Sequence, residues 1–267
     1  TVQDETNPGL PIRASFHGEL REEQRPAAES LLAFPNGVLS ATTAFGKTVI
    51  ASYLIGQRKT NTLILVHTQA LLNQWKAALG QFLTIDEELP PTPKRRGRKK
   101  EYALIGQLGG TKNNLSGFVD IAILQSLVSG DEIRPLVKNY GMVIVDECHH
   151  VSAVSFEKVL KEVNARYVYG LTATPTRQDG HQAIIYMQCG SIRYRVSAKE
   201  QAEKRAFTHA ILPRFTAFAQ PLTEEKRWTI TQAYGAMAGD ESRNGKIVED
   251  VLGALAAGRT PLVLTER

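Results

Sequence analysis

The sequence predicts an α/β fold with a parallel sheet flanked by helices, and three observations support this class. Short apolar runs, typical of strands buried on both faces, alternate with amphipathic stretches of helical period. Alternation of strand and helix requires crossover connections, which favour parallel pairing. A Gly-Lys-Thr step at 46–48 follows one of the apolar runs, as expected where a strand turns tightly into a helix.

The order of these patterns predicts individual elements. Buried strands are expected at 37–41, 62–67, 121–125, 142–146 and 167–171. Helices are expected at 47–57, 69–82 and 156–164, and the apolar stripe of the second comprises Leu71, Leu72, Trp75, Ala78 and Leu79. Strand-like runs at 192–196 and 210–218 are expected to close the sheet edge, so the first lobe should span residues 1–221.

The remainder, residues 222–267, is expected to hold interlobe helices and the start of a second lobe. A helical pattern covers 222–260 with a break between Gly239 and Gly245, and 261–265 resembles an opening strand. The chain begins without methionine and ends directly after that run. We therefore expect a fragment of a longer protein.

Composition narrows the class of protein. Of the 267 residues 42% are hydrophobic, which suffices for a globular core. The net charge of +5 is local, because a run of six basic residues lies in the proline-containing segment 86–100, predicted to be an exposed, mobile loop. Two cysteines, Cys148 and Cys189, are too few for a disulfide framework. The sequence shows neither a leader peptide nor an apolar run of about 18 residues. We therefore expect a soluble, intracellular protein of the cytoplasm, associated with the nucleoid if it is prokaryotic.

The segment 41–48 has the chemistry of a phosphate-binding loop. A tight turn before a helix presents backbone N–H groups to a phosphate, together with one ammonium and one hydroxyl. Ala41 stands where the general motif has its first glycine, so an ordinary helix start after a buried strand is the alternative. The residues expected to bind the nucleotide are Thr43, Ala44, Phe45, Gly46, Lys47 and Thr48.

A pair of adjacent carboxylates, Asp146 and Glu147, follows the apolar run at 142–145. Ligands of open α/β sheets bind at the carboxyl ends of strands, where one acid can hold a metal ion and its neighbour can activate water. A zinc site built on Cys148, His149 and His150 is the alternative. It is disfavoured because adjacent histidines point in different directions and no Cys-x-x-Cys partner is present.

The order of these motifs resembles the first lobe of superfamily 2 helicases and translocases, which consist of two RecA-like lobes. A Leu-Arg-x-x-Gln element at 20–24, the loop at 41–48, the Asp-Glu-x-His box at 146–149 and the Thr-Ala-Thr step at 172–174 carry the resemblance. The Asp-Glu-x-His-His box and the stretch 170–177 look closest to the XPB-like and type III restriction-subunit branch.

The resemblance implies a role for each motif. Gln24 would read adenine with support from Arg21, although a solvated helix start would also fit. Ala41 is the family's own residue, and the departure is Ala44 at an internal glycine, which would cost about 1 kcal/mol if that position needs a positive φ. Lys47 would reach the β- and γ-phosphates of ATP. Mg²⁺ would be held by Thr48 and Asp146, catalysis would also use Glu147 and His149, and coupling between lobes would use Thr172, Ala173 and Thr174.

Contacts with nucleic acid are expected from loops on what the family resemblance places at the opposite rim of the lobe. Hydroxyls and glycine N–H groups suit phosphate contacts that do not read bases, but ordinary turns and helix caps would look the same. The candidates are Thr68, Gln69, Gly109, Gly110, Thr111, Gln125 and Ser126. The basic run could bind DNA electrostatically, or it could be a solvated loop or a localisation signal. It comprises Lys94, Arg95, Arg96, Arg98, Lys99 and Lys100.

These expectations describe the first motor lobe of an ATP-dependent DNA helicase or double-strand DNA translocase that uses Mg²⁺ and binds DNA rather than RNA. Alternatives are the motor subunit of a restriction or anti-phage complex with a nuclease partner, and a nucleotide-gated binding module without efficient hydrolysis. Because a second lobe normally supplies an arginine to the transition state, this chain alone is expected to hydrolyse ATP slowly.

Overall fold

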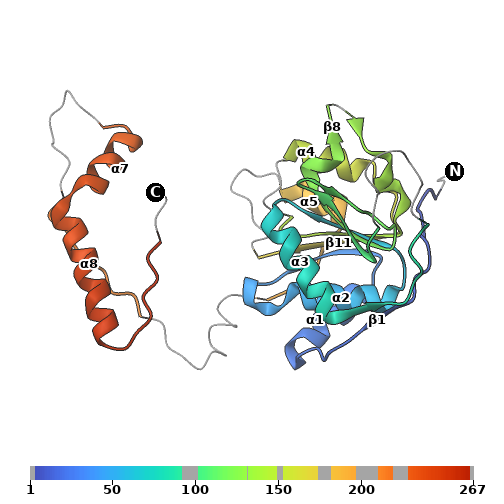
Figure 1. The fold of residues 1–267 in the computed structure, drawn as a ribbon, viewed down its shortest axis with the longest axis horizontal. Helices are drawn as coiled ribbons and strands as arrows, with labels where there is room; N and C mark the ends of the chain where they lie inside the picture. The colour runs from blue at the N-terminus through green and yellow to red at the C-terminus, as the bar shows by residue number, and fades with distance from the viewer. Residues whose placement is uncertain are drawn as a thin grey trace. The chain divides into compact units, whose positions relative to one another are not determined.

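The computed structural model describes residues 4–91, 102–130, 132–148, 153–173, 182–196, 210–218 and 228–264 (Figure 1). The chain separates into two compact units, Thr1–Arg205 and Ala206–Arg267. The lobe boundary predicted near Pro221 and the assignment of residues 222–267 to a second lobe stay predictions. Within the described residues, no helix is both long and apolar enough to cross a membrane.

The first unit is built on a sheet that has eight strands in the described residues, and all neighbours are parallel except the last pair. The expected α/β class with a parallel sheet is therefore confirmed. In sheet order the strands are β12 (Ile192–Arg195), β2 (Asn36–Ser40), β11 (Tyr167–Thr172), β10 (Met142–Val145), β3 (Thr62–Val66), β7 (Val119–Ile123), β5 (Ile105–Gly109) and β6 (Lys112–Asn113).

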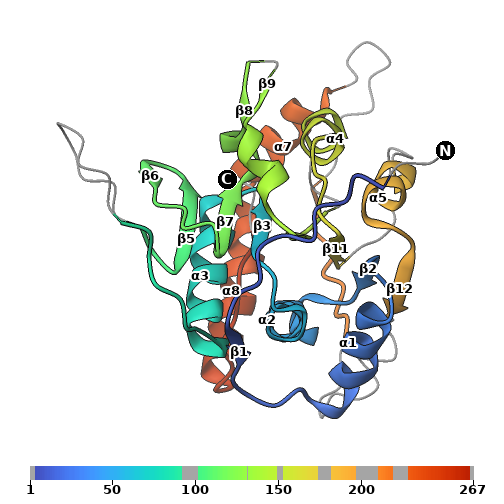
Figure 2. The same ribbon diagram turned by 90° about the vertical axis from the view of Figure 1, so that its right-hand side faces the viewer.

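Helices cover both faces of this sheet (Figures 1 and 2). Side chains on the central strands alternate between two cores: Ile64 and Val66 of β3 belong to one, and Leu63 and Leu65 to the other. The first core is covered by α1 (Arg25–Leu32), α2 (Lys47–Arg58) and α3 (Gln69–Phe82), and the second by α4 (Ala153–Lys161), α5 (Gln182–Cys189), η3 (Leu124–Leu127) and η4 (Pro135–Asn139).

The predicted elements of this unit are found with small shifts at their ends. Helix α3 has the predicted bounds, whereas α4 begins three residues before the expected 156–164. Strand β7 ends at Ile123 because Leu124–Leu127 form a 3-10 turn. The edge strand expected at 192–196 pairs with β2. Three antiparallel pairs were not foreseen: β1 (Ala14–Phe16) with β4 (Leu83–Ile85), β8 (Val128–Ser129) with β9 (Glu132–Ile133), and β5 with β6 at the end of the main sheet.

The second unit contains α7 (Ile230–Gly239) and α8 (Glu241–Ala256) in its described part. The predicted break falls at Asp240, whose side chain accepts a hydrogen bond from Arg243 N–H and so starts a new helix. Two strand predictions were wrong, because 210–218 and the described part of the last run, 261–264, form no strand. Apolar alternation is not sufficient for a strand without a hydrogen-bonding neighbour.

A buried carboxylate organises the amino ends of the strands. Asp120 of β7 accepts hydrogen bonds from Tyr140 Oη at 2.7 Å and from the N–H groups of Ser116 and Gly117 at 2.9 and 2.7 Å. Burial nevertheless raises the pKa of Asp120 above its ordinary value, while the Tyr140 hydrogen bond opposes that shift. Ionised Asp120 therefore lowers the stability of the fold at neutral pH, and its donors offset part of this cost.

Tyr140→Phe is expected to lower the free energy of unfolding by about 1–3 kcal/mol at pH 7, because it removes a donor from a buried charge. The loss should be smaller near pH 4. A raised carboxyl pKa makes stability fall as the pH rises through the window above about 3.8, and removing the donor deepens that fall. Urea unfolding at both pH values measures the difference, with exposed Tyr234→Phe as the control. Equal losses at both pH values would contradict the assignment.

Candidate nucleotide-binding site

The loop between β2 and α2 has the shape that its sequence predicts. Residues Thr43–Phe45 form the 3-10 turn η2, and Gly46 then adopts φ +84° immediately before the first turn of α2. A Cβ atom on Gly46 would lie 2.4 Å from Gln24 Nε2, so the position requires glycine both for its backbone and for space. Helix N–H groups with no intrahelical partner follow directly, at the end that attracts anions.

Ala44 is accommodated without the expected strain. It lies in η2, is exposed, and is not among the described non-glycine residues with positive φ. The positive φ of the loop falls on Gly46 instead. The cost considered for an alanine at this position therefore does not arise in this conformation.

Lys47 is the cation at the centre of the site. Its side chain is 6% exposed, and Nζ donates to the Ala41 carbonyl at 3.1 Å and forms an ion pair with Glu147 Oε1 at 3.4 Å. Thr48, whose hydroxyl was predicted to hold Mg²⁺, lies in the same first turn of α2. The loop and the acidic pair, about 100 residues apart in the sequence, are thus brought into direct contact.

The acidic pair follows β10 at the carboxyl edge of the sheet. Asp146 Oδ1 accepts from the Glu147 N–H at 3.0 Å, and Oδ2 accepts from Trp75 Nε1 at 2.7 Å. Burial raises the pKa of Asp146 above its ordinary value, opposed by the Trp75 hydrogen bond and by the charge of Lys47. Glu147 adopts φ +46°, a backbone conformation that is uncommon outside glycine and is enriched at active sites.

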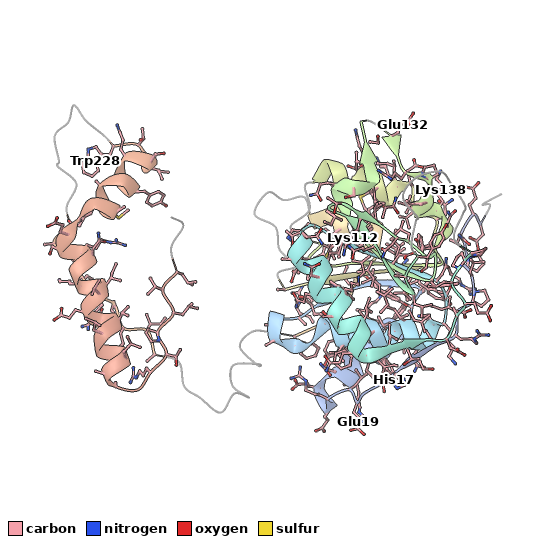
Figure 3. The ribbon with its side chains drawn as sticks, viewed as in Figure 1. His17, Glu19, Lys112, Glu132, Lys138 and Trp228 are labelled. Atoms are coloured by element: carbon pink, nitrogen blue, oxygen red, sulfur yellow. The ribbon has the colours of Figure 1, made fainter. Side chains whose placement is uncertain are left out.

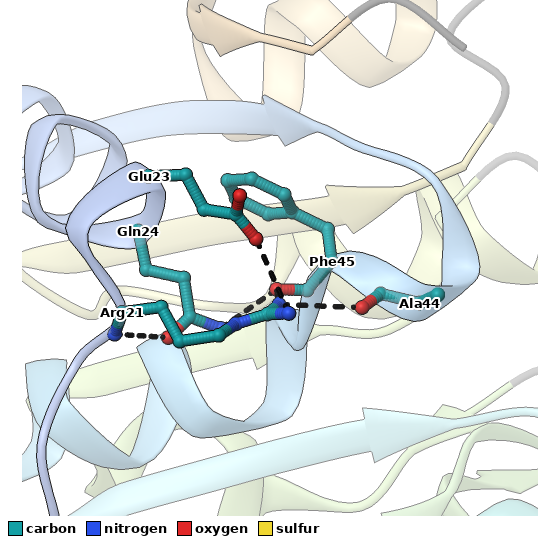
Figure 4. Close-up of polar contacts among 5 residues, drawn as sticks. All are labelled: Arg21, Glu23, Gln24, Ala44 and Phe45. Carbon is teal, nitrogen blue, oxygen red and sulfur yellow. Dashed lines mark hydrogen bonds and ion pairs between the residues drawn. The ribbon is translucent and has the colours of Figure 1, made fainter. Parts of the chain in front are cut away.

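The Leu-Arg-x-x-Gln element contacts the loop itself (Figure 4). Gln24 is buried; its Oε1 accepts from the Arg21 N–H at 2.9 Å and its Nε2 donates to the Phe45 carbonyl at 2.7 Å. Arg21 Nη2 donates to the same carbonyl at 2.6 Å and to that of Ala44 at 3.3 Å. Both residues therefore support the loop backbone in this conformation, and adenine reading by Gln24, which would require exchange of these bonds, stays a prediction.

The Thr-Ala-Thr step begins at the end of β11. Thr172 is buried, and its carbonyl accepts from the Ala41 N–H at 2.9 Å, which ties this strand to the start of the loop. Ala173 follows β11, whereas Thr174 lies outside the described residues, as does His149. Two of the three residues of the zinc alternative, His149 and His150, lie outside the described residues, and burial raises the pKa of the third, the Cys148 thiol.

The described candidates for contact with nucleic acid lie along the same edge of the sheet as the loop. Thr68 caps α3 after β3, Gly110 turns the chain after β5 with Thr111, and Gln125 and Ser126 lie in η3 after β7. The expectation of an opposite rim was wrong, because parallel strands place all their carboxyl ends on one edge. Strand order instead divides this edge into a half at β2, β11 and β10 and a half at β3, β7 and β5.

Two of the nucleic-acid candidates are neighbours in space. A Cβ atom on Gly110 would lie 3.0 Å from Gln69 Oε1, so the β5–β6 turn meets the start of α3. Gly109, the last residue of β5, packs against Ile123 and Leu72. Exposed Lys112 follows the turn in β6 and was not among the predicted residues (Figure 3). The basic run 94–100 lies outside the described residues.

Trp75 is a site residue that the sequence analysis did not identify, since it was assigned only to an apolar stripe. The signal available was the indole N–H, which needs a partner when the ring is buried. The contact of Arg21, which precedes the 3-10 turn Glu22–Gln24, with the loop likewise became visible only in the folded chain.

A strand, glycine turn and helix that carry a lysine opposite two carboxylates define a P-loop nucleotide triphosphatase fold of the RecA-like class. Residues 17–177 match the family described as "Type III restriction enzyme, res subunit". The match covers more than half of the chain, which therefore belongs to this family. It is a first lobe of the superfamily 2 helicase type, in the XPB and type III restriction branch.

Individual relatives agree with this family. The chain is 28% identical over 210 residues to "DNA 3'-5' translocase XPB2" of Sulfurisphaera tokodaii, covering 79% of this chain and 43% of that protein. It is 28% identical over 189 residues to "DNA 3'-5' helicase XPB" of Mycobacterium tuberculosis, covering 67% and 31%. The fold resembles that of the UvsW helicase from bacteriophage T4, with a TM-score of 0.52, 19% identity and coverage of 69% and 64%. The chain thus spans less than half the length of these curated relatives.

Proposed function

We propose that this chain is the nucleotide-binding lobe of an ATP-dependent DNA helicase or translocase, and that it binds ATP with Mg²⁺ at the carboxyl ends of β2 and β10. The observation that carries the proposal is the 3.4 Å approach of Lys47 Nζ to Glu147 Oε1 beside a glycine-defined helix start. An ammonium, free helix N–H groups and carboxylates are the groups that phosphoryl transfer requires.

The donor set also fits Mg²⁺. This ion prefers oxygen ligands and retains waters, and the Thr48 hydroxyl and the Asp146 carboxylate are ligands of that kind. Bound Mg²⁺ would supply neutralisation of phosphate charge. Thr42 Oγ1 is buried and has no hydrogen-bond partner among the described residues, which is the state expected of a group directed towards a ligand.

The protein groups would act in sequence. Lys47 would exchange the Ala41 carbonyl and Glu147 for phosphate oxygens, and Glu147, released from the ion pair, would orient and deprotonate the attacking water. His149 would assist, and the step 172–174 would transmit the change to a second lobe. A second lobe would supply an arginine that stabilises the transition state. Without it, ATP turnover by this chain alone would be slower than that of a two-lobed protein by about a thousandfold or more, the effect of such an arginine in related phosphoryl transfers.

DNA is the proposed polymer because both curated relatives described above are named for activity on DNA. Contacts would involve Thr68, Gln69, the turn at 109–111, and Gln125 with Ser126. The basic run 94–100 would add a salt-dependent attraction to the backbone. A nuclease partner is the related proposal, favoured by the restriction-enzyme family name. On a protein that contains both lobes, a strand-displacement assay measures unwinding and a triplex-displacement assay measures translocation, so the two assays together distinguish these activities.

Lys47→Ala is expected to weaken binding of a fluorescent ATP analogue in the presence of Mg²⁺ by at least about tenfold, because it removes the buried ammonium that faces the phosphates. The matched control is Lys138→Ala, an exposed lysine in η4 (Figure 3). The control should bind like the unsubstituted chain. Equal affinity of the Lys47 variant and the control would contradict the proposed site.

A further inference from the structure

An indole hydrogen bond joins the core of the first unit to the acidic pair. Trp75 lies two turns into α3 and is 1% exposed, and its Nε1 donates to Asp146 Oδ2 at 2.7 Å. Asp146 is itself only 6% exposed. Within the described residues, Trp75 is the one side chain that donates a hydrogen bond to this carboxylate.

The hydrogen bond restricts the orientation of Asp146. Oδ2 is held by Trp75 from α3, and Oδ1 is held by the Glu147 N–H from the chain that follows β10. Rotation of the carboxylate would therefore break at least one bond in a buried setting, where loss is costly. Each carboxylate oxygen has two acceptor sites, so both retain one for a metal ion or its water.

Lys47 does not perform this role. Its Nζ is engaged by the Ala41 carbonyl at 3.1 Å and by Glu147 at 3.4 Å. The ammonium would also move towards phosphate when nucleotide binds, whereas the indole is fixed by packing in the core with Leu72, Leu79 and Ile144. The rigid donor is thus the one suited to hold Asp146 before and after binding.

We propose that Trp75 is a positioning residue, which holds the Asp146 carboxylate in the orientation that receives Mg²⁺. This inference rests on the proposed function, since it concerns the same metal site. It adds that α3, whose first residues are candidates for contact with nucleic acid, supplies the hydrogen bond that orients the metal carboxylate.

The test is a Mg²⁺ titration of fluorescent ATP-analogue binding with the 267-residue chain and Trp75→Phe. Loss of the N–H should raise the Mg²⁺ concentration at half-saturation about tenfold, as is common for partners of metal ligands, while affinity without Mg²⁺ stays unchanged. Phenylalanine also has a smaller ring than tryptophan, so a second variant carries 3-benzothienylalanine at position 75. Trp228→Phe in the same chain leaves position 75 as the one tryptophan site to be replaced. Benzothienylalanine keeps the indole shape and lacks only the donor.

The outcomes separate the inference from the function on which it rests. A raised Mg²⁺ midpoint in the benzothienyl variant, with thermal unfolding unchanged, supports positioning. An unchanged midpoint in that variant overturns the inference alone. If the unsubstituted chain fails to bind the analogue, the proposed function is overturned together with it.

A spectroscopic readout is available in the same background. The chain has two tryptophans, so Trp228→Phe leaves Trp75 as the single indole emitter. Addition of Mg²⁺ to the nucleotide-bound chain should shift its emission, because a divalent charge arrives on its hydrogen-bond acceptor. The shift should vanish in Asp146→Asn, and an equal shift in that variant would overturn the proposal.

Discussion

Glu147→Gln is expected to lower ATP turnover by at least about a hundredfold, the usual scale for loss of a general base. Glutamine has nearly the same shape but cannot accept the proton of the attacking water. It also removes the ion pair with Lys47 at 3.4 Å. The Lys47 ammonium then meets phosphate without competition from the Glu147 carboxylate, so nucleotide affinity should be equal to that of the unsubstituted chain or tighter.

This combination of results distinguishes the functions under comparison. Turnover is measured with labelled ATP over hours, because the chain alone is expected to be slow, and affinity is measured with a fluorescent analogue. Glu132→Gln, in the β8–β9 hairpin and exposed, removes the same charge away from the site (Figure 3). Retained turnover in Glu147→Gln would favour the nucleotide-gated binding module.

Gly46→Ala should weaken nucleotide binding by at least about tenfold, because the loop cannot keep its present course with a side chain there. A non-glycine residue in the left-handed region costs about 1–2 kcal/mol. In addition, the new Cβ would lie 2.4 Å from Gln24 Nε2, within the contact that supports the loop. Relief of this clash would displace either Gln24 or the helix start that presents N–H groups to phosphate.

A glycine-to-alanine substitution away from the site should stabilise the fold and leave nucleotide binding intact. A Cβ atom at Gly80, in α3, would meet nothing within 4 Å, so Gly80→Ala should stabilise the fold by about 0.5–1 kcal/mol and leave nucleotide binding unchanged. Thermal unfolding and analogue binding of both variants make the comparison. Nucleotide binding by Gly46→Ala equal to that of Gly80→Ala would show that the loop tolerates a side chain and would contradict the proposed geometry.

The site was predictable where chemistry is carried by adjacent residues. Residue type and spacing alone indicate the function of two segments, Gly46-Lys47-Thr48 and Asp146-Glu147. In an α/β fold, segments of this kind follow strands. The interactions among motifs were not predictable in this way. The Gln24 contact with Phe45 and the Trp75 contact with Asp146 join residues far apart in the sequence, and no local pattern records such a pairing.

The sequence by itself determined the parallel α/β class, most of its strands and helices, and the identity of the loop and acidic residues, because apolar period and turn chemistry are local properties. The tertiary structure decided which segments pair and what each polar group meets. Within the described residues it left 210–218 without a strand partner, and it placed the predicted DNA contacts at 68–69, 109–111 and 125–126 on the same edge as the nucleotide site, because parallel strands end together. It also turned Trp75 from a core residue into a partner of Asp146, because burial obliges an indole N–H to find an acceptor.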